Sequence, residues 1–183
     1  MSSVFSNPAG AAHEAATQYV QALMDLLGNR DPLKVQDELY DAIVSEVTGL
    51  EEAALRRPEK PGKWSIMQVV QHLADSELVS GYRIRMILTH PNPPIQGYDQ
   101  DAWANELRYN GVSLRDALEQ LRVLRALNLK LVRSLSKEQL AREGLHSERG
   151  TESVWKITQM IAGHDLLHRN QIQRIKRTIG LEP

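Results

Sequence analysis

Two histidines four residues apart stand in the last long apolar segment of this sequence. Residues at this spacing lie one above the other on a helix, so His164 and His168 are expected to point to the same side. The stripe that continues this face at steps of three and four is otherwise mostly apolar: Val154, Ile157, Ile161, His164, His168, Gln171 and Ile175. Such a stripe faces the core of a helix bundle, where a buried imidazole needs a partner.

A metal ion would be one such partner. Three neutral imidazoles can hold zinc, nickel or ferrous iron and leave a position open for water or substrate. His72 is the best candidate for the third, because it lies about two turns into a helix and beside its apolar row. The other histidines compete less well: His13 lies near the start of the chain, His90 in a Pro-rich turn and His146 in a polar loop. The alternative is a set of core histidines satisfied without metal.

Two glutamines accompany the candidate ligands. Gln68 precedes His72 by four residues and Gln171 follows His168 by three. Either amide could hydrogen-bond a ligand or a metal-bound water. For Gln68 a second explanation exists, because it also occupies the third position of a capping box that begins at Ser65.

The charged residues near these positions have simpler interpretations. We expect Glu77 on the surface, and we expect Asp165 to balance Arg169 four residues later. The last helix ends in basic residues that complement its dipole: Arg169, Arg174, Lys176 and Arg177. No interleaved aromatic residues accompany them, so they do not indicate nucleic-acid binding.

The composition narrows the class of protein. A chain of 183 residues predicts one domain, and a formal net charge of −1 gives no general attraction to nucleic acid. The absence of Cys excludes disulfides, a Cys nucleophile and thiolate ligands. The first ten residues lack the features of a signal peptide, and no apolar run approaches the ~20 residues of a membrane span. We therefore expect a cytoplasmic protein with no membrane partner.

Apolar periodicity and helix-capping residues predict an all-α chain. Asp31 followed by Pro32 favours one helix start, and Ser65 and Ser113 favour two others. In chain order we expect a loose arm at residues 1–10, a helix over Ala11–Leu27, a long helix that begins at Pro32 and ends before Pro58, a second over Ser65–Leu88, a third from Ser113 through Leu131, and a last one from Thr151 or Ser153 to about Ile179.

The connections complete the predicted fold. Pro91–Gly111 is long enough to be a crossover that covers something. Ser136–Gln139 forms a second capping box, and Arg142–Gly150 is expected to be loop; we find no strand pattern. The prediction is a four-helix bundle with a long crossover between the second and third long helices, plus an extra N-terminal helix. The arm and that helix would occupy residues 1–30 and the bundle residues 31–183.

Three separated motifs resemble the DinB/YfiT-like superfamily. They are Pro61–Ile66 followed by His72–Glu77, then Gly97–Trp103, then Gly163–Ile172. The resemblance covers about residues 30–178. It implies a four-helix bundle, often dimeric, with one divalent ion (nickel, zinc or iron) bound by three histidines. The positions that match are His72, His164 and His168.

The resemblance leaves three functions open. The first is a metal-dependent S-transferase that joins a small cellular thiol, such as bacillithiol or mycothiol, to an electrophile. In it Gln68, Gln171, Tyr98 or Asp101 would orient the substrate. The second is a hydrolase that uses metal-bound water, with Asp101 on the crossover as general base. The third is a non-enzymatic, stress-associated helical dimer with a structural or incidental metal. A fourth protein ligand on the metal would favour the third function. We expect a small-molecule substrate and a homodimer.

Overall fold

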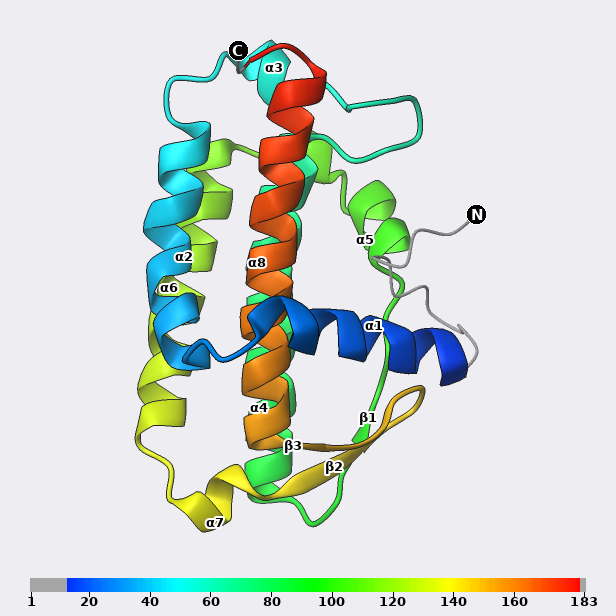
Figure 1. The fold of residues 1–183 in the computed structure, drawn as a ribbon, viewed down its shortest axis with the longest axis vertical. Helices are drawn as coiled ribbons and strands as arrows, with labels where there is room; N and C mark the ends of the chain where they lie inside the picture. The colour runs from blue at the N-terminus through cyan, green and yellow to red at the C-terminus, as the bar shows by residue number, and fades with distance from the viewer. Residues whose placement is uncertain (1–12, 182–183) are drawn as a thin grey trace.

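A computed structural model describes residues 13–181. The predicted arm at residues 1–10 lies outside this range. Four long helices form the bundle: α2 (Pro32–Val47), α4 (Ile66–Thr89), α6 (Leu114–Arg133) and α8 (Val154–Thr178). In Figure 1, α2 and α8 run in one direction and α4 and α6 in the other. The predicted four-helix bundle is confirmed. Within residues 13–181, no helix is both long enough and apolar enough to cross a membrane.

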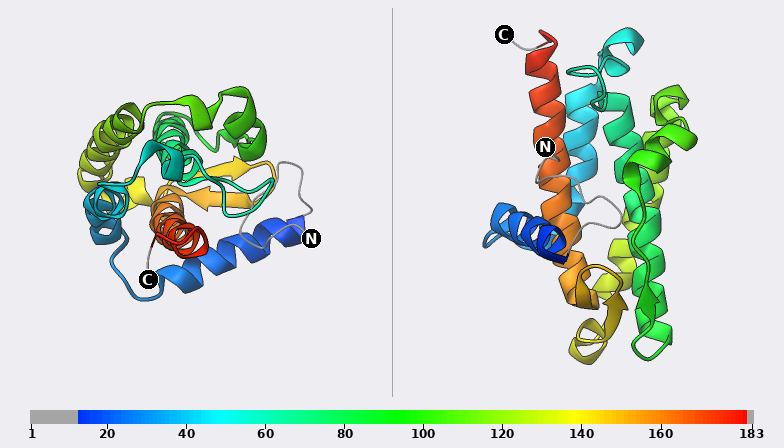
Figure 2. Two further views of the ribbon diagram at one scale, coloured as in Figure 1. Left: turned by 90° about the horizontal axis from the view of Figure 1, so that it is seen from above. Right: turned by 90° about the vertical axis from the view of Figure 1, so that its right-hand side faces the viewer.

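The order of the helices around the bundle explains the crossover. α4 packs against α6 and α8, and α2 packs against the same two helices, so α2 and α4 occupy opposite corners when the bundle is seen from above (Figure 2). Because α4 and α6 are neighbours that run in the same direction, the chain must return along the whole bundle between them. This return is the predicted crossover, and it contains β1 (Pro94–Ile95), α5 (Gln100–Glu106) and the 3₁₀ turn η1 (Tyr109–Gly111).

The predicted helix starts are confirmed by their caps. The Asp31 side chain accepts a hydrogen bond from the Leu33 N–H, with Pro32 in the first turn. At α4, Ser65 and Gln68 form both bonds of the capping box. These bonds satisfy backbone donors that would otherwise lack a partner at a helix start. α4 therefore begins at a defined residue, which fixes the rotation at which His72 enters the bundle.

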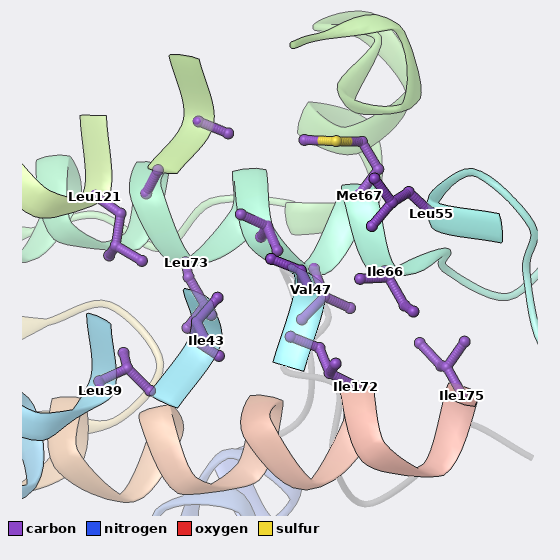
Figure 3. Packing of buried hydrophobic residues seen from close by; sticks show 14 residues of the cluster. Leu39, Ile43, Val47, Leu55, Ile66, Met67, Leu73, Leu121, Ile172 and Ile175 are labelled. Atoms are coloured by element: carbon purple, nitrogen blue, oxygen red, sulfur yellow. The ribbon is translucent and has the colours of Figure 1, made fainter. Parts of the chain in front are cut away.

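The core lies between the four long helices. Apolar side chains from α2, α4, α6 and α8 meet there (Figure 3). Its members include Leu39, Ile43, Val47, Ile66, Leu73, Leu121, Ile172 and Ile175. Burying such side chains stabilises the fold by about 1.5–3 kcal/mol each, and it holds α4 and α8 at the separation that the functional site requires.

The prediction that no strand occurs is wrong. β2 (Glu143–His146) and β3 (Gly150–Ser153) form an antiparallel hairpin in the segment expected to be loop, and β1 pairs with β2 in parallel. Strands of two to four residues are too short to show a clear alternation, so tertiary contacts decide their conformation. Gly144 shows this: a Cβ atom there would lie 2.8 Å from Ile95 Cδ1. α3 (Glu52–Leu55) and α7 (Lys137–Leu140) are short helices in the connections.

The extra N-terminal helix is present as α1 (His13–Leu27), which lies across α8 (Figures 1 and 2). The two backbones approach closely at Gly163, where an added Cβ would lie 2.3 Å from the carbonyl oxygen of Leu23. Tyr19 and Leu23 of α1 pack with Met160 of α8. α1 therefore covers one side of the bundle. The predicted division of the chain after residue 30 stays a prediction.

Candidate metal centre

The three predicted histidines meet inside the bundle. His72 comes from α4, and His164 and His168 come from successive turns of α8. One ring nitrogen from each lies within 4.8 Å of the other two, and the Nε2 atoms of His72 and His164 are 3.0 Å apart. The ring centroids lie 4.3–5.0 Å from one another. The side chains therefore converge on one point rather than stacking against separate apolar neighbours.

The surroundings favour neutral imidazoles. Burial lowers the pKa of His168 to about 4, and it holds the pKa values of His72 and His164 well below their usual range. The Nδ1 of His168 lies 2.7 Å from the Gln171 carbonyl oxygen, so Nδ1 carries the proton and donates it. The lone pair of His168 is then on Nε2, as a metal ligand requires. Gln171 takes the hydrogen-bonding role that the sequence suggested.

The cluster fits a divalent cation better than a set of hydrogen-bonded core histidines. Two nitrogens on one tetrahedral zinc lie about 3.4 Å apart, from Zn–N distances near 2.0–2.1 Å, which is close to the separation between His72 and His164. One proton can bridge only one pair of nitrogens, whereas a cation satisfies all three. Within residues 13–181, no other His, Cys, Asp or Glu joins the group.

Three further side chains surround the histidines. The Ser76 hydroxyl lies 3.4 Å from His72 Nε2 and 3.4 Å from the Tyr98 hydroxyl, so the two hydroxyls extend from the cluster toward the crossover. The Trp64 ring packs 4.9 Å from the His72 ring. Neither Trp64 nor Ser76 was predicted to be a site residue. Helical spacing held a signal for Ser76, because it follows His72 by four residues.

A pocket with a cavity volume of about 90 Å³ opens beside His164. α4 and α8 form its main walls, and α1 closes it with Tyr19 and Leu23. Tyr98 contributes from the crossover. His164 is the histidine of the cluster that lines this pocket, and it is half-buried. A small molecule in the pocket would therefore approach the cluster from the His164 side.

A buried ionic network in the wall of the pocket shows that two expectations are wrong. Glu77 was expected on the surface, but its side chain is only 2% exposed and pairs with Arg125 at 3.1 Å. Asp165 was expected to balance Arg169, but it binds Arg125 through both carboxylate oxygens, at 2.5 and 2.9 Å. Burial alone would lower the pKa of Arg125, but the two carboxylates outweigh burial and raise it. The network ties α4, α6 and α8 together next to His164.

A third buried carboxylate, that of Asp75, holds the crossover against the bundle. Asp75 accepts a hydrogen bond from the Tyr109 hydroxyl at 2.5 Å and one from the Gln120 amide at 2.7 Å. Gln71 donates a third at 3.1 Å. These neutral donors stabilise a buried acidic group without a positive charge. They also hold the chain that carries Tyr98 against α4.

The remaining candidates lie elsewhere. Gln68 accepts from the Ser65 N–H, which is its capping role. Asp101 is exposed on α5 and donates its own N–H to Asp99; its role as a base stays a prediction. His146 is not in a polar loop: it is 2% exposed in β2, and its Nδ1 accepts from the N–H groups of residues 148 and 149.

Comparison with known proteins agrees with the fold and with a metal ion. The DinB superfamily model matches residues 37–172. A protein of Oceanobacillus iheyensis is 30% identical over 132 residues, covering 72% of this chain and 76% of that protein. One of Bacillus cereus is 27% identical over 144 residues, covering 79% and 83%. Both are provisionally named metal-dependent hydrolases.

A solved structure adds to this comparison. YfiT of Bacillus subtilis superposes with a TM-score of 0.76 at 26% identity, covering 81% of this chain and 86% of that one. It is described, again provisionally, as a metal-dependent hydrolase with an unusual four-helix bundle topology. α1 lies outside the residues that the family model matches. The chain belongs to the DinB superfamily.

Proposed function

We propose that this protein is a metal-dependent hydrolase whose divalent ion (zinc, nickel or iron) is held by His72, His164 and His168. The observation that carries the proposal is the convergence of three neutral imidazoles beside a pocket. The names of its relatives support the same reaction class. In this proposal, the metal ion and the substrate bind at the same site in the bundle.

The number of protein ligands supports a catalytic rather than a structural ion. Structural zinc sites usually have four protein ligands, whereas catalytic sites have three and an open position. Among residues 13–181, the group contains three such side chains. The non-enzymatic dimer, which would favour a fourth ligand, therefore has less support than an enzyme.

The chain's own residues would position the reactants. When bound, a divalent ion supplies a Lewis acid and lowers the pKa of a coordinated water. Gln171 holds the His168 ring in the orientation that points Nε2 toward the cluster. The hydroxyls of Ser76 and Tyr98 can donate hydrogen bonds to a substrate oxygen at the pocket side. The apolar wall from α1 and α8 limits access of bulk water.

The thiol S-transferase stays a prediction, because none of the relatives described above carries a transferase name. The two reactions differ in the nucleophile, which is water for the hydrolase and a small thiol for the transferase. They can therefore be separated in one assay that includes or omits the thiol. The predicted homodimer and cytoplasmic location also stay predictions.

The test combines metal content with hydrolysis. We expect metal analysis by mass spectrometry to give one ion per wild-type chain, and His168→Ala to lose that ion while remaining helical. His90→Ala is the matched control, because His90 is exposed at the end of α4. A panel of 4-nitrophenyl esters should be cleaved by wild type and His90→Ala only.

Two results would contradict the proposal. Full metal occupancy in His168→Ala would remove the ligand assignment. Turnover of monobromobimane or a chlorodinitrobenzene that requires both metal and a low-molecular-weight thiol, with no cleavage of the esters, would replace the hydrolase by the transferase.

A further inference from the structure

Two arginines besides Arg125 line the pocket that opens beside His164. Arg83 comes from α4 and Arg149 from the turn between β2 and β3. Arg83 follows His72 by eleven residues, which is about 16 Å along the helix at 1.5 Å per residue. Ser76 lies on the same side of α4 between them. The pocket therefore runs along α4 from His164, at the edge of the histidine cluster, to the guanidinium groups of Arg83 and Arg149.

The two arginines differ in their partners. Arg149 forms an ion pair with Glu152 at 2.5 Å, and both side chains are at most 7% exposed. Arg83 donates to the neutral carbonyl of Gln96 at 2.6 Å and lies 5.9 Å from the centre of the Tyr98 ring. Among residues 13–181, no carboxylate forms an ion pair with Arg83. One positive charge in this part of the pocket is therefore not matched by a contacting anion.

The electrostatics of Arg83 agree with this difference. Burial lowers the pKa of Arg83, and the nearby positive charge of Arg149 lowers it further. Tyr98, Glu152 and Glu148 act in the opposite direction, but the net effect is a lowered pKa. Arg149 already has Glu152 as its counter-ion, so an anion bound at Arg83 would supply the contacting negative charge that Arg83 lacks. The planar, multiply donating guanidinium also matches the geometry of carboxylate and phosphate oxygens.

Two tyrosine hydroxyls of this region can also donate hydrogen bonds. The Tyr19 and Tyr98 hydroxyls line the pocket, and burial raises the pKa of each, so both keep their protons. The carboxylates that line the pocket, Glu77 and Asp165, are both bound by Arg125. The pocket therefore offers hydrogen-bond donors to an anion, while its two carboxylates are already occupied by Arg125.

We propose that Arg83, supported by Arg149, binds an anionic group of the substrate, so that the pocket selects small molecules that bear a carboxylate or a phosphate. This inference rests on the proposed function, because it places the scissile bond at the histidine cluster. The separation along α4 puts the anionic group away from the bond that is cut. Binding energy from such a remote group can orient the substrate for reaction.

Calorimetric titration with two probes, inorganic phosphate and butyrate, tests the proposal on the metal-loaded protein. We expect at least one probe to bind wild type with one site per chain. Arg83→Gln should weaken that binding by about tenfold or more, because it removes a charge-assisted hydrogen bond. Arg115→Gln is the control, because Arg115 is exposed on α6. Arg83→Lys keeps the charge without the forked donors and should fall between the two.

A histidine variant separates this site from the metal centre. In His168→Ala, the probe should still bind with nearly the wild-type affinity, whether or not the protein is a hydrolase. The proposal is overturned if neither probe binds wild type, if folded Arg83→Gln and Arg83→Lys bind as tightly as Arg115→Gln, or if binding is lost in His168→Ala. The last result would place the anion on the metal instead.

Discussion

Replacing Gln171 tests how the bundle prepares a histidine to bind metal. Gln171 accepts the Nδ1–H of His168 at 2.7 Å, and both residues lie on α8. In Gln171→Leu, this buried N–H loses its partner, and the ring is free to rotate. A lost outer hydrogen bond of this kind typically weakens metal binding by about 10- to 100-fold, which is about 1.4–2.8 kcal/mol. We expect zinc affinity to fall within that range.

The assay is competition for zinc with a chromophoric chelator at pH 7. Gln173→Leu is the matched control, because Gln173 lies two residues further on the same helix and donates to Glu46 at 2.6 Å, away from the cluster. The control should bind zinc as wild type does. Equal zinc affinities for the two variants would refute the reasoning that Gln171 orients His168.

Two further predictions concern stability. Burial lowers the pKa of His168 from 6.5 to about 4, so its contribution is full above pH 6.5 and is lost as the pH falls toward 4. The free energy of unfolding of the metal-free protein, measured with urea, should fall by about 3 kcal/mol over that pH range because of this group. An unchanged free energy of unfolding between pH 7 and 5 would contradict this prediction. Gly163→Ala should destabilise the protein by about 1–3 kcal/mol, because its Cβ would meet the backbone of Leu23. An unchanged melting temperature would argue against this close contact between α1 and α8.

Much of the fold could be predicted because local signals and apolar periodicity agree. Ser65 with Gln68, and Ser136 with Gln139, are capping boxes in the sequence and in the structure. The spacing of His164 and His168 places both on one face of any helix that contains them. His72 could be predicted as the third histidine for the same reason, because it lies beside the apolar row of another long helix.

The errors share a physical cause, which is that the partner is distant in the sequence. Glu77 and Asp165 look like surface acids until Arg125, 48 and 40 residues away, is placed beside them. The available signal for Arg125 was its place on α6 four residues after Leu121 and four before Leu129, both of which are buried. The hairpin β2–β3 was missed because its conformation depends on β1 and on the close approach at Gly144.

The central claim is that one divalent ion is held by three imidazoles from α4 and α8. Anomalous diffraction at the zinc absorption edge, from crystals of the zinc-loaded protein, tests it most directly. We predict one strong peak per chain about 2.0–2.1 Å from a ring nitrogen of each of His72, His164 and His168. A peak at another site, with these three rings in direct contact and no density between them, would contradict it.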